Sequence, residues 1–191
     1  MPGKAFSAIY EVAEDQLGYV TTAQAEAIGI EKGTLAKMAT RGVLERVSRG
    51  VYRVVNYPLS PYGQYMEAVL WPDGITGVVS HESALVLHRI SDVSPPSVHI
   101  TVPASFRIRR AIPRNIAVHH ADVERNEVEH VEGIPVTSAA RTIHDCYAAH
   151  LGPALIRQAI EDGRRNGALM LDMADALERE LLGSARTEVR R

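Results

Sequence analysis

Basic residues gather in one short stretch of this sequence, between residues 32 and 53. The stretch contains only one acidic residue, Glu45. Its six basic residues are Lys32, Lys37, Arg41, Arg46, Arg49 and Arg53. Positive charge at this density attracts nucleic-acid phosphates of any sequence, and an inserted helix can then read base edges. The stretch therefore predicts DNA binding. The alternative is a solvated helix face followed by an ordinary charged hairpin.

Three predicted helices position the first half of this stretch. Apolar residues at steps of three and four predict helices over residues 5–17, 23–28 and 32–41, with a glycine after each. Thr21 or Thr22 can cap the second helix. In the third, Leu35 and Met38 face inward. The outer side carries Lys32, Gly33, Thr34, Lys37 and Arg41, and Gly33 would let the backbone approach a surface closely.

A predicted hairpin positions the second half. Two alternating, β-branched runs over residues 43–54 flank Ser48-Arg49-Gly50. Three helices followed by a hairpin outline a winged helix-turn-helix, with Arg49 at the tip of the wing. The residues expected to contact DNA are Thr22, Lys32, Thr34, Lys37, Arg41, Arg46, Arg49 and Arg53.

A second basic patch lies between two predicted strands and precedes an acidic run. The patch consists of Arg107, Arg109, Arg110 and Arg114; the run consists of Asp122, Glu124, Glu127, Glu129 and Glu132. The patch offers a second phosphate contact or a dock for a protein partner. The alternative is a solvated hairpin loop with opposite charges nearby.

Signals for metal binding or catalysis are weak. His81-Glu82 begins like a zinc-protease helix, but Leu85 stands where the second histidine should be. His119-His120, His144 with Cys146, and His150 could in principle bind a metal, but unpatterned histidines are usually surface or capped core residues. No nucleophile motif or phosphate loop occurs, and Cys146 fits an apolar core. We expect no metal, no cofactor and no catalytic residue, and an enzyme, such as a nuclease remnant, ranks last.

The whole chain has 191 residues and a formal net charge of -2. A loop with two prolines near residues 56–61 predicts a boundary between a winged helix-turn-helix domain, 1–56, and a second domain, 62–183, with a flexible tail at 184–191. No segment is apolar enough for a bilayer span or a signal peptide, and a lone cysteine fits a reducing cytoplasm.

The second domain is expected to be α/β, which makes the whole chain α+β. Strands are predicted over 77–79, 97–102, 115–120 and 133–136, the last an edge or a short piece because of Pro135. Helices are predicted over 62–70, 80–88, 138–150, 153–166 and 169–182. Met170, Met173, Leu177 and Leu181 form one apolar stripe on the last helix.

Several of these motifs, in this order, resemble the AbiEi family of antitoxins and transcriptional regulators. In the first half they are Gly18–Ala25, Gly29–Ile30, Gly33–Leu35, Arg41–Leu44 and Arg49–Arg53. In the second half they are Ser80–Leu85, Val98–Pro103 and Gly133–Ser138, leading to Arg141–Thr142. The resemblance spans about residues 17–148. Glu31 departs from it, since the family often has a serine-type helix cap there. Some related proteins continue into a Vsr-like nuclease domain, which we do not expect here because the sequence ends at Arg191.

The resemblance implies a DNA-binding antitoxin that represses its own toxin–antitoxin operon, whose toxin is a nucleotidyltransferase. It implies that the partner is double-stranded operator DNA with inverted repeats, on which the protein self-associates. It also implies that the second domain supports multimer formation or neutralisation of the toxin. No membrane partner is expected. The alternative is a protein-interaction antitoxin that neutralises the toxin by direct contact through the second domain.

Overall fold

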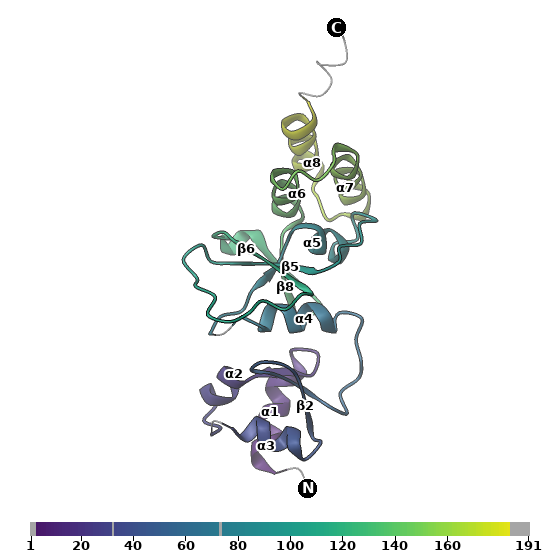
Figure 1. The fold of residues 1–191 in the computed structure, drawn as a ribbon. Coiled ribbons are helices and arrows are strands. Elements are labelled where there is room, and N and C mark those ends of the chain that lie inside the picture. Colours follow the sequence, from purple (N-terminus) through teal and green to yellow (C-terminus); the bar gives the residue numbers. More distant parts are fainter. Residues whose placement is uncertain (1–2, 32, 73, 184–191) are drawn as a thin grey trace. The chain divides into compact units, whose positions relative to one another are not determined.

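The structure is a computed structural model that describes residues 3–31, 33–72 and 74–183. It confirms the α+β class: helices alternate with the strands of two small sheets (Figure 1). The chain forms two compact units, residues 1–77 with 132–134, and residues 78–131 with 135–191. The expected tail, 184–191, lies outside the described residues. The expected domain limits, 1–56 and 62–183, stay predictions.

Three helices surround one apolar cluster in the first unit. They are α1 (Lys4–Glu14), α2 (Thr22–Ala27) and α3 (Thr34–Thr40). Thr21 caps α2: its hydroxyl accepts the Gln24 N–H, and the Gln24 side chain accepts the Thr21 N–H in return. The buried cluster consists of Ile9, Ala13, Val20, Ala25, Leu35, Leu44, Tyr52 and Val54. The predicted inward side of the third helix is thus confirmed for Leu35, and Met38 packs against the same cluster.

A three-stranded antiparallel sheet completes this unit. Its order is β1 (Tyr19–Thr21), β3 (Val51–Val54), β2 (Leu44–Ser48), so the predicted hairpin is present. The strand β1 was not expected, because three residues are too short for a visible alternation. Helix α4 (Gly63–Leu70) packs against β1: a Cβ on Gly63 would lie 2.9 Å from Tyr19 Oη. In the structural division, α4 therefore belongs to the first unit.

The turn between α1 and β1 requires glycine at position 18. Gly18 has φ +86° and donates its N–H to the Ala13 carbonyl, which closes the end of α1. A Cβ at this position would come within 2.5 Å of Tyr57 Cγ. The residue therefore meets two constraints at once, a left-handed backbone and a close aromatic neighbour.

The second sheet has five strands in the order β6-β5-β4-β8-β7. Their bounds are β4 (Val78–Val79), β5 (Val98–Val102), β6 (Ile116–His120), β7 (Val128–Val131) and β8 (Ile134–Thr137). β4 pairs antiparallel with β5 and parallel with β8, and β5 pairs parallel with β6. The strand β7, after the short 3-10 helix η1 (Arg125–Glu127), was not expected. Pro135 lies in a short strand as expected, but β8 has β4 and β7 on its two sides, so the edge alternative was wrong.

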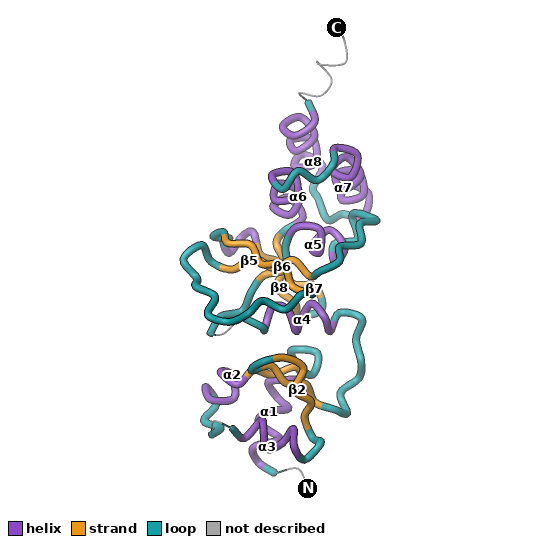
Figure 2. Tube along the Cα trace, in the orientation of Figure 1, coloured by secondary structure: helices purple, strands orange, loops and turns teal. Residues whose placement is uncertain are grey.

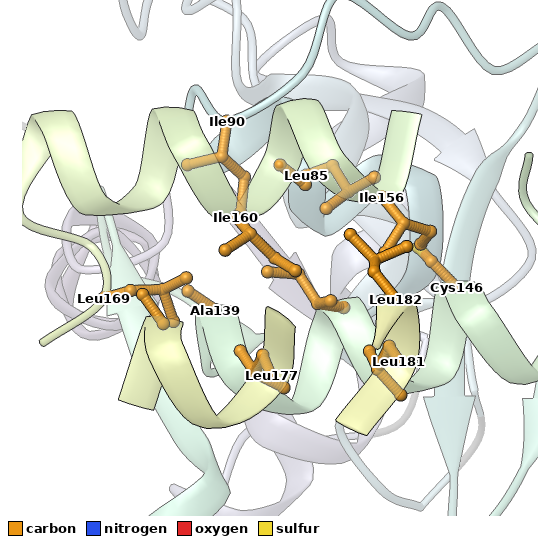
Figure 3. Packing of buried hydrophobic residues seen from close by; sticks show 13 residues of the cluster. Leu85, Ile90, Ala139, Cys146, Ile156, Ile160, Leu169, Leu177, Leu181 and Leu182 are labelled. Atoms are coloured by element: carbon orange, nitrogen blue, oxygen red, sulfur yellow. The ribbon is translucent and has the colours of Figure 1, made fainter. Parts of the chain in front are cut away.

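Helices α5 (His81–Leu87), α6 (Ala139–Ala148), α7 (Pro153–Asn166) and α8 (Leu171–Leu177), followed by the π-helix η2 (Glu178–Leu182), share the core of the second unit. Figure 3 shows Ile156 and Ile160 of α7 beside Leu85, Cys146, Leu177 and Leu182. The predicted apolar stripe on the last helix was only half right. Leu177 and Leu181 are buried, but Met170 and Met173 are exposed by 78% and 46%. Met170 is the N-cap residue, before the α-helix begins at Leu171.

No helix among the described residues combines the length and the apolar character that crossing a membrane would need.

Candidate nucleic-acid interface

The outer face of α3 carries two exposed cations, as the sequence predicted. Lys37 lies in the middle of the helix, and Arg41 is its C-cap residue, donating its N–H to the Lys37 carbonyl. Thr34, the first helical residue, is half-buried. Two exposed residues on this helix, Ala36 and Thr40, were missed because neither is charged.

The start of α3 differs from the prediction. The helix begins at Thr34, not at position 32, because Gly33 is its N-cap residue with φ +90°. A Cβ on Gly33 would meet nothing within 4 Å, so the left-handed backbone explains this glycine. Glu31 is therefore not the helix cap; its carbonyl accepts the Thr34 N–H and its side chain is exposed. Lys32 lies outside the described residues.

The hairpin of β2 and β3 is tied to the start of α2. Its turn consists of Arg49 and Gly50. The backbone N–H and the hydroxyl of Thr22 both donate to the Gly50 carbonyl, at 2.9 Å and 3.4 Å. The register shifts between Arg46 and Ser48, as in a β-bulge, which bends this arm of the hairpin. Thr22 therefore holds the tip close to the helices, and both Arg46 and Arg49 are exposed.

The structure places Arg53 inside the fold. It lies on the central strand, between Tyr19 on β1 and Glu45 on β2. Its guanidinium donates to the Tyr57 carbonyl at 2.7 Å and lies 3.9 Å from the Glu45 carboxylate, and the residue is only 8% exposed. Arg53 is thus separated from the exposed cations, and it falls out of the set that we propose for DNA contact. Alternation along β3 could not reveal this, because the burial of a central strand depends on both neighbouring strands.

The second basic patch lies on a long connection between β5 and β6. Residues 103–115 contain no helix or strand (Figure 2), and the two strands they join are parallel. The hairpin loop that the sequence suggested is therefore wrong, and the segment is a crossover. Arg107, Arg109 and Arg114 are exposed, whereas Arg110 is half-buried.

Part of the acidic run supports the second unit internally. Asp122 accepts the Ala104 N–H, next to the start of the crossover. Arg141 lies between Glu127, at 2.6 Å, and Asp145, at 2.8 Å. The bridge joins α6 to the segment before β7, so these carboxylates serve the fold as well as solubility.

Three histidines meet where α5, β5 and β6 come together. His81 is the first residue of α5, and it stacks on His119 of β6 with ring centroids 3.6 Å apart. His99 of β5 is the register neighbour of Ala117, and its Nδ1 lies 3.0 Å from His119 Nε2. Glu82 reaches the other nitrogen of His99, Nε2, at 3.1 Å. The sequence singles out His81 and His119 only separately and does not reveal the cluster, since only the fold brings positions 81, 99 and 119 together.

Burial keeps these rings neutral near pH 7. Desolvation, with smaller effects of neighbouring cationic groups, lowers the pKa of His81 and of His119 to about 4. Desolvation also lowers the pKa of His99, opposed by the Glu82 carboxylate. Their ring nitrogens therefore have lone pairs available, and ligand nitrogens of all three lie within 4.8 Å of one another.

The surroundings of Cys146 disfavour a nucleophilic thiolate. The side chain is buried in the core of the second unit, as predicted, and desolvation raises the pKa of its thiol to about 12. The reactive thiolate is thus strongly disfavoured at neutral pH.

The segment that holds the exposed cations of α3 and the hairpin matches a known protein family. Residues 7–55 match the model of a family described as a transcriptional regulator, the AbiEi antitoxin. That family is one of regulators. A comparison with curated proteins found no match.

Over the whole chain, the fold is similar to the crystal structure of the Rv2827c protein from Mycobacterium tuberculosis. The TM-score is 0.54 at 15% sequence identity, and the match covers 97% of this chain and 74% of that one. At this identity the similarity concerns the fold alone.

Proposed function

We propose that this chain, whose residues 7–55 match the AbiEi antitoxin regulators, is a DNA-binding antitoxin that represses transcription of its own toxin–antitoxin operon. One observation carries the proposal. Within the matched segment, Lys37 and Arg41 on α3 and Arg46 and Arg49 on the hairpin are all exposed. Four cations on two neighbouring elements form a compact contact for phosphates and base edges.

In this proposal α3 enters the major groove of the operator. Lys37 and Arg41 are four residues apart, so they lie on one side of the helix. Both can donate to guanine O6 and N7 or to phosphate, and Thr34 donates or accepts near the helix start. Ala36 and Thr40 are exposed beside these groups, where their small side chains allow close approach to base edges.

The hairpin supplies the wing. Arg49 at its tip and Arg46 on its arm contact phosphate or the minor groove. Thr22 donates to the Gly50 carbonyl at that tip, which supports a role for it in aligning the wing. Arg53 has no part in the proposed contact because its guanidinium is committed inside the fold.

A contact surface this small favours an operator in which the recognised DNA sequence is repeated. One helix and one wing cover a single half-site, so two copies on inverted repeats would add their contacts on one operator. We therefore propose self-association on DNA. The exposed Arg107, Arg109 and Arg114 of the crossover offer a further phosphate contact or a dock for a protein partner.

Footprinting of the purified protein on the promoter region of its own gene tests the proposal. We expect protection of an inverted repeat, and lower expression of a reporter driven by that promoter when the protein is present. A promoter that stays unprotected and fully active at micromolar protein would contradict autorepression.

A second candidate function is direct neutralisation of a nucleotidyltransferase toxin by the second unit. The observation that favours it is an exposed apolar group at the start of α8: Met170, Leu171 and Met173 are exposed by 78%, 67% and 46%. Solvent-exposed apolar side chains that cluster in this way are typical of protein contacts. The two functions reside on different units and can both hold.

Co-expression with a nucleotidyltransferase from the neighbouring gene tests this second function. A Met170→Ser and Leu171→Ser double variant should fail to co-elute with the toxin while still binding promoter DNA. Unchanged co-elution and unchanged protection from the toxin would refute a contact through this group.

A further inference from the structure

The three-histidine cluster has the layout of a metal site. His81, His99 and His119 come from three different elements, α5, β5 and β6, and none is adjacent to another in sequence. The shortest approach is 3.0 Å, between His99 Nδ1 and His119 Nε2, and one ligand nitrogen from each ring falls within 4.8 Å of the others. Ligands on a tetrahedral Zn²⁺, each about 2.0–2.1 Å from the ion, are about 3.3 Å apart. His99 and His119 are close to this spacing, whereas the His81 ring, stacked on His119 with centroids 3.6 Å apart, must rotate out of the stack to direct a ring nitrogen at the same ion.

Hydrogen bonds outside the cluster select which nitrogens face inward. Glu82 lies 3.1 Å from His99 Nε2, which places the proton on that nitrogen and leaves Nδ1 as the ligand. His81 Nδ1 lies 2.9 Å from Ser80 Oγ, and where Nδ1–H donates to that oxygen, Nε2 of His81 is left as the ligand. The hydroxyl of Thr101 in turn donates to Ser80 Oγ at 2.8 Å, and Ser80 and Thr101 are both buried. A ligand histidine whose other nitrogen bonds a carboxylate or a hydroxyl is the usual arrangement around zinc.

The carboxylates near the cluster and the backbone conformation of His81 also favour a metal site. The Asp145 carboxylate acts electrostatically on His119, and its Oδ2 is buried without a hydrogen-bond partner among the described residues. Glu82 is a second carboxylate beside the neutral rings, and Arg141, which forms an ion pair with Asp145, opposes these negative charges. His81 also has φ +52°, a left-handed backbone that is rare for a non-glycine residue and that is concentrated at functional sites.

We propose that His81, His99 and His119 bind one Zn²⁺ ion, through Nε2 of His81, Nδ1 of His99 and Nε2 of His119. Three imidazoles leave a fourth coordination position for water or another ligand. The ion would join α5 to the edge strand β6 and so stabilise the second unit. The proposal does not depend on DNA binding by the first unit.

A proton must move when the ion binds. In the metal-free cluster His99 carries its proton on Nε2, so His119 donates from Nε2 to the lone pair on His99 Nδ1. Zinc on His119 Nε2 displaces that proton to His119 Nδ1. The tautomer of His99 stays the same, whereas that of His119 changes.

Nitrogen NMR of the histidine rings in the full wild-type chain, titrated with Zn²⁺ after chelator treatment, tests this prediction. We expect saturation at one ion per chain, ring-nitrogen shifts at His81, His99 and His119, and the tautomer change at His119. No binding below millimolar Zn²⁺, or binding that leaves these three rings unchanged, would overturn the proposal.

Calorimetric titration of variants gives a second test. His99→Gln and His119→Gln should each weaken Zn²⁺ binding at least 100-fold, and Glu82→Gln should weaken it about 10- to 100-fold through the tautomer of His99. His120→Gln is the matched control, because its side chain is the exposed neighbour on β6. Equal affinity in His119→Gln and His120→Gln, with both variants folded by circular dichroism, would show that the cluster is only a hydrogen-bonded stack.

Discussion

Arg49 and Arg53 belong to one hairpin but have different surroundings. Arg49 is exposed at the turn, whereas the Arg53 guanidinium is held by the Tyr57 carbonyl and the Glu45 carboxylate. A basic residue in the segment that we propose binds DNA can therefore either contact DNA or stabilise the fold. Substituting each one separates the two roles.

Arg49→Ala should flatten the dependence of operator affinity on salt by about one unit of slope, because one phosphate contact is lost. Arg53→Ala should leave that slope unchanged. It should instead lower the free energy of unfolding by about 1–3 kcal/mol, since the half-buried Tyr57 carbonyl loses its donor. Anisotropy titrations at several salt concentrations and urea denaturation measure the two effects; a reversed pattern would contradict the placement of Arg53.

Gly18 and Gly29 allow a similar comparison for backbone strain. Both have positive φ, +86° and +79°, but only Gly18 has an aromatic ring where a Cβ would lie. Gly29→Ala should cost about 1 kcal/mol of unfolding free energy from the left-handed backbone. Gly18→Ala should cost clearly more, about 3 kcal/mol, because the Tyr57 ring must also move. Equal losses in urea denaturation would mean that the contact with Tyr57 has no energetic weight.

At the scale of elements, the histidine cluster links the stability of the second unit to pH. His81 and His119 have folded-state pKa values of about 4, below the ordinary 6.5, chiefly because burial disfavours their charged forms. Between these values the unfolded chain binds protons that the folded chain does not. The contribution is therefore complete above pH 6.5 and is lost as the pH falls towards 4.

Lowering the pH from 7 to 5, in chelator, should reduce the free energy of unfolding by on the order of 2 kcal/mol through this cluster. The groups around it are Glu82, Asp145, Arg141 and His120. His119→Gln should flatten the loss relative to wild type, whereas His130→Gln, an exposed position, should not. Parallel slopes for all three proteins in urea denaturation at pH 7, 6 and 5 would exclude the rings as the source.

Elements with a strong local signal could be predicted from the sequence. Helix α7 was expected over its observed range, 153–166, because Pro153 starts it and Gly167 ends it. The hairpin was visible from Arg49 and Gly50. The strands β1 and β7 were missed because they are short and are fixed by their partners. The parallel pairing of β5 and β6, and the meeting of His81, His99 and His119, depend on contacts between distant residues that no local pattern carries.

The whole molecule has a net charge near neutrality that conceals an uneven distribution. Residues 1–56 have a net charge of +1 and the remainder -3, yet the exposed cations of α3 and the hairpin lie together in the first unit. Affinity for DNA should therefore depend on this compact contact rather than on bulk charge. Removing two cations from this contact should therefore weaken operator binding far more than removing two exposed cations elsewhere in the chain.

Operator affinity of the Lys37→Ala and Arg41→Ala double variant tests the central claim most directly. Arg125→Ala with Arg157→Ala is the matched control, since both residues are exposed cations in the second unit. At about 1–3 kcal/mol for each good contact, anisotropy titration should show a loss of at least 30-fold for the first pair and less than 3-fold for the control. An unchanged operator affinity in the Lys37 and Arg41 variant would contradict DNA recognition through α3.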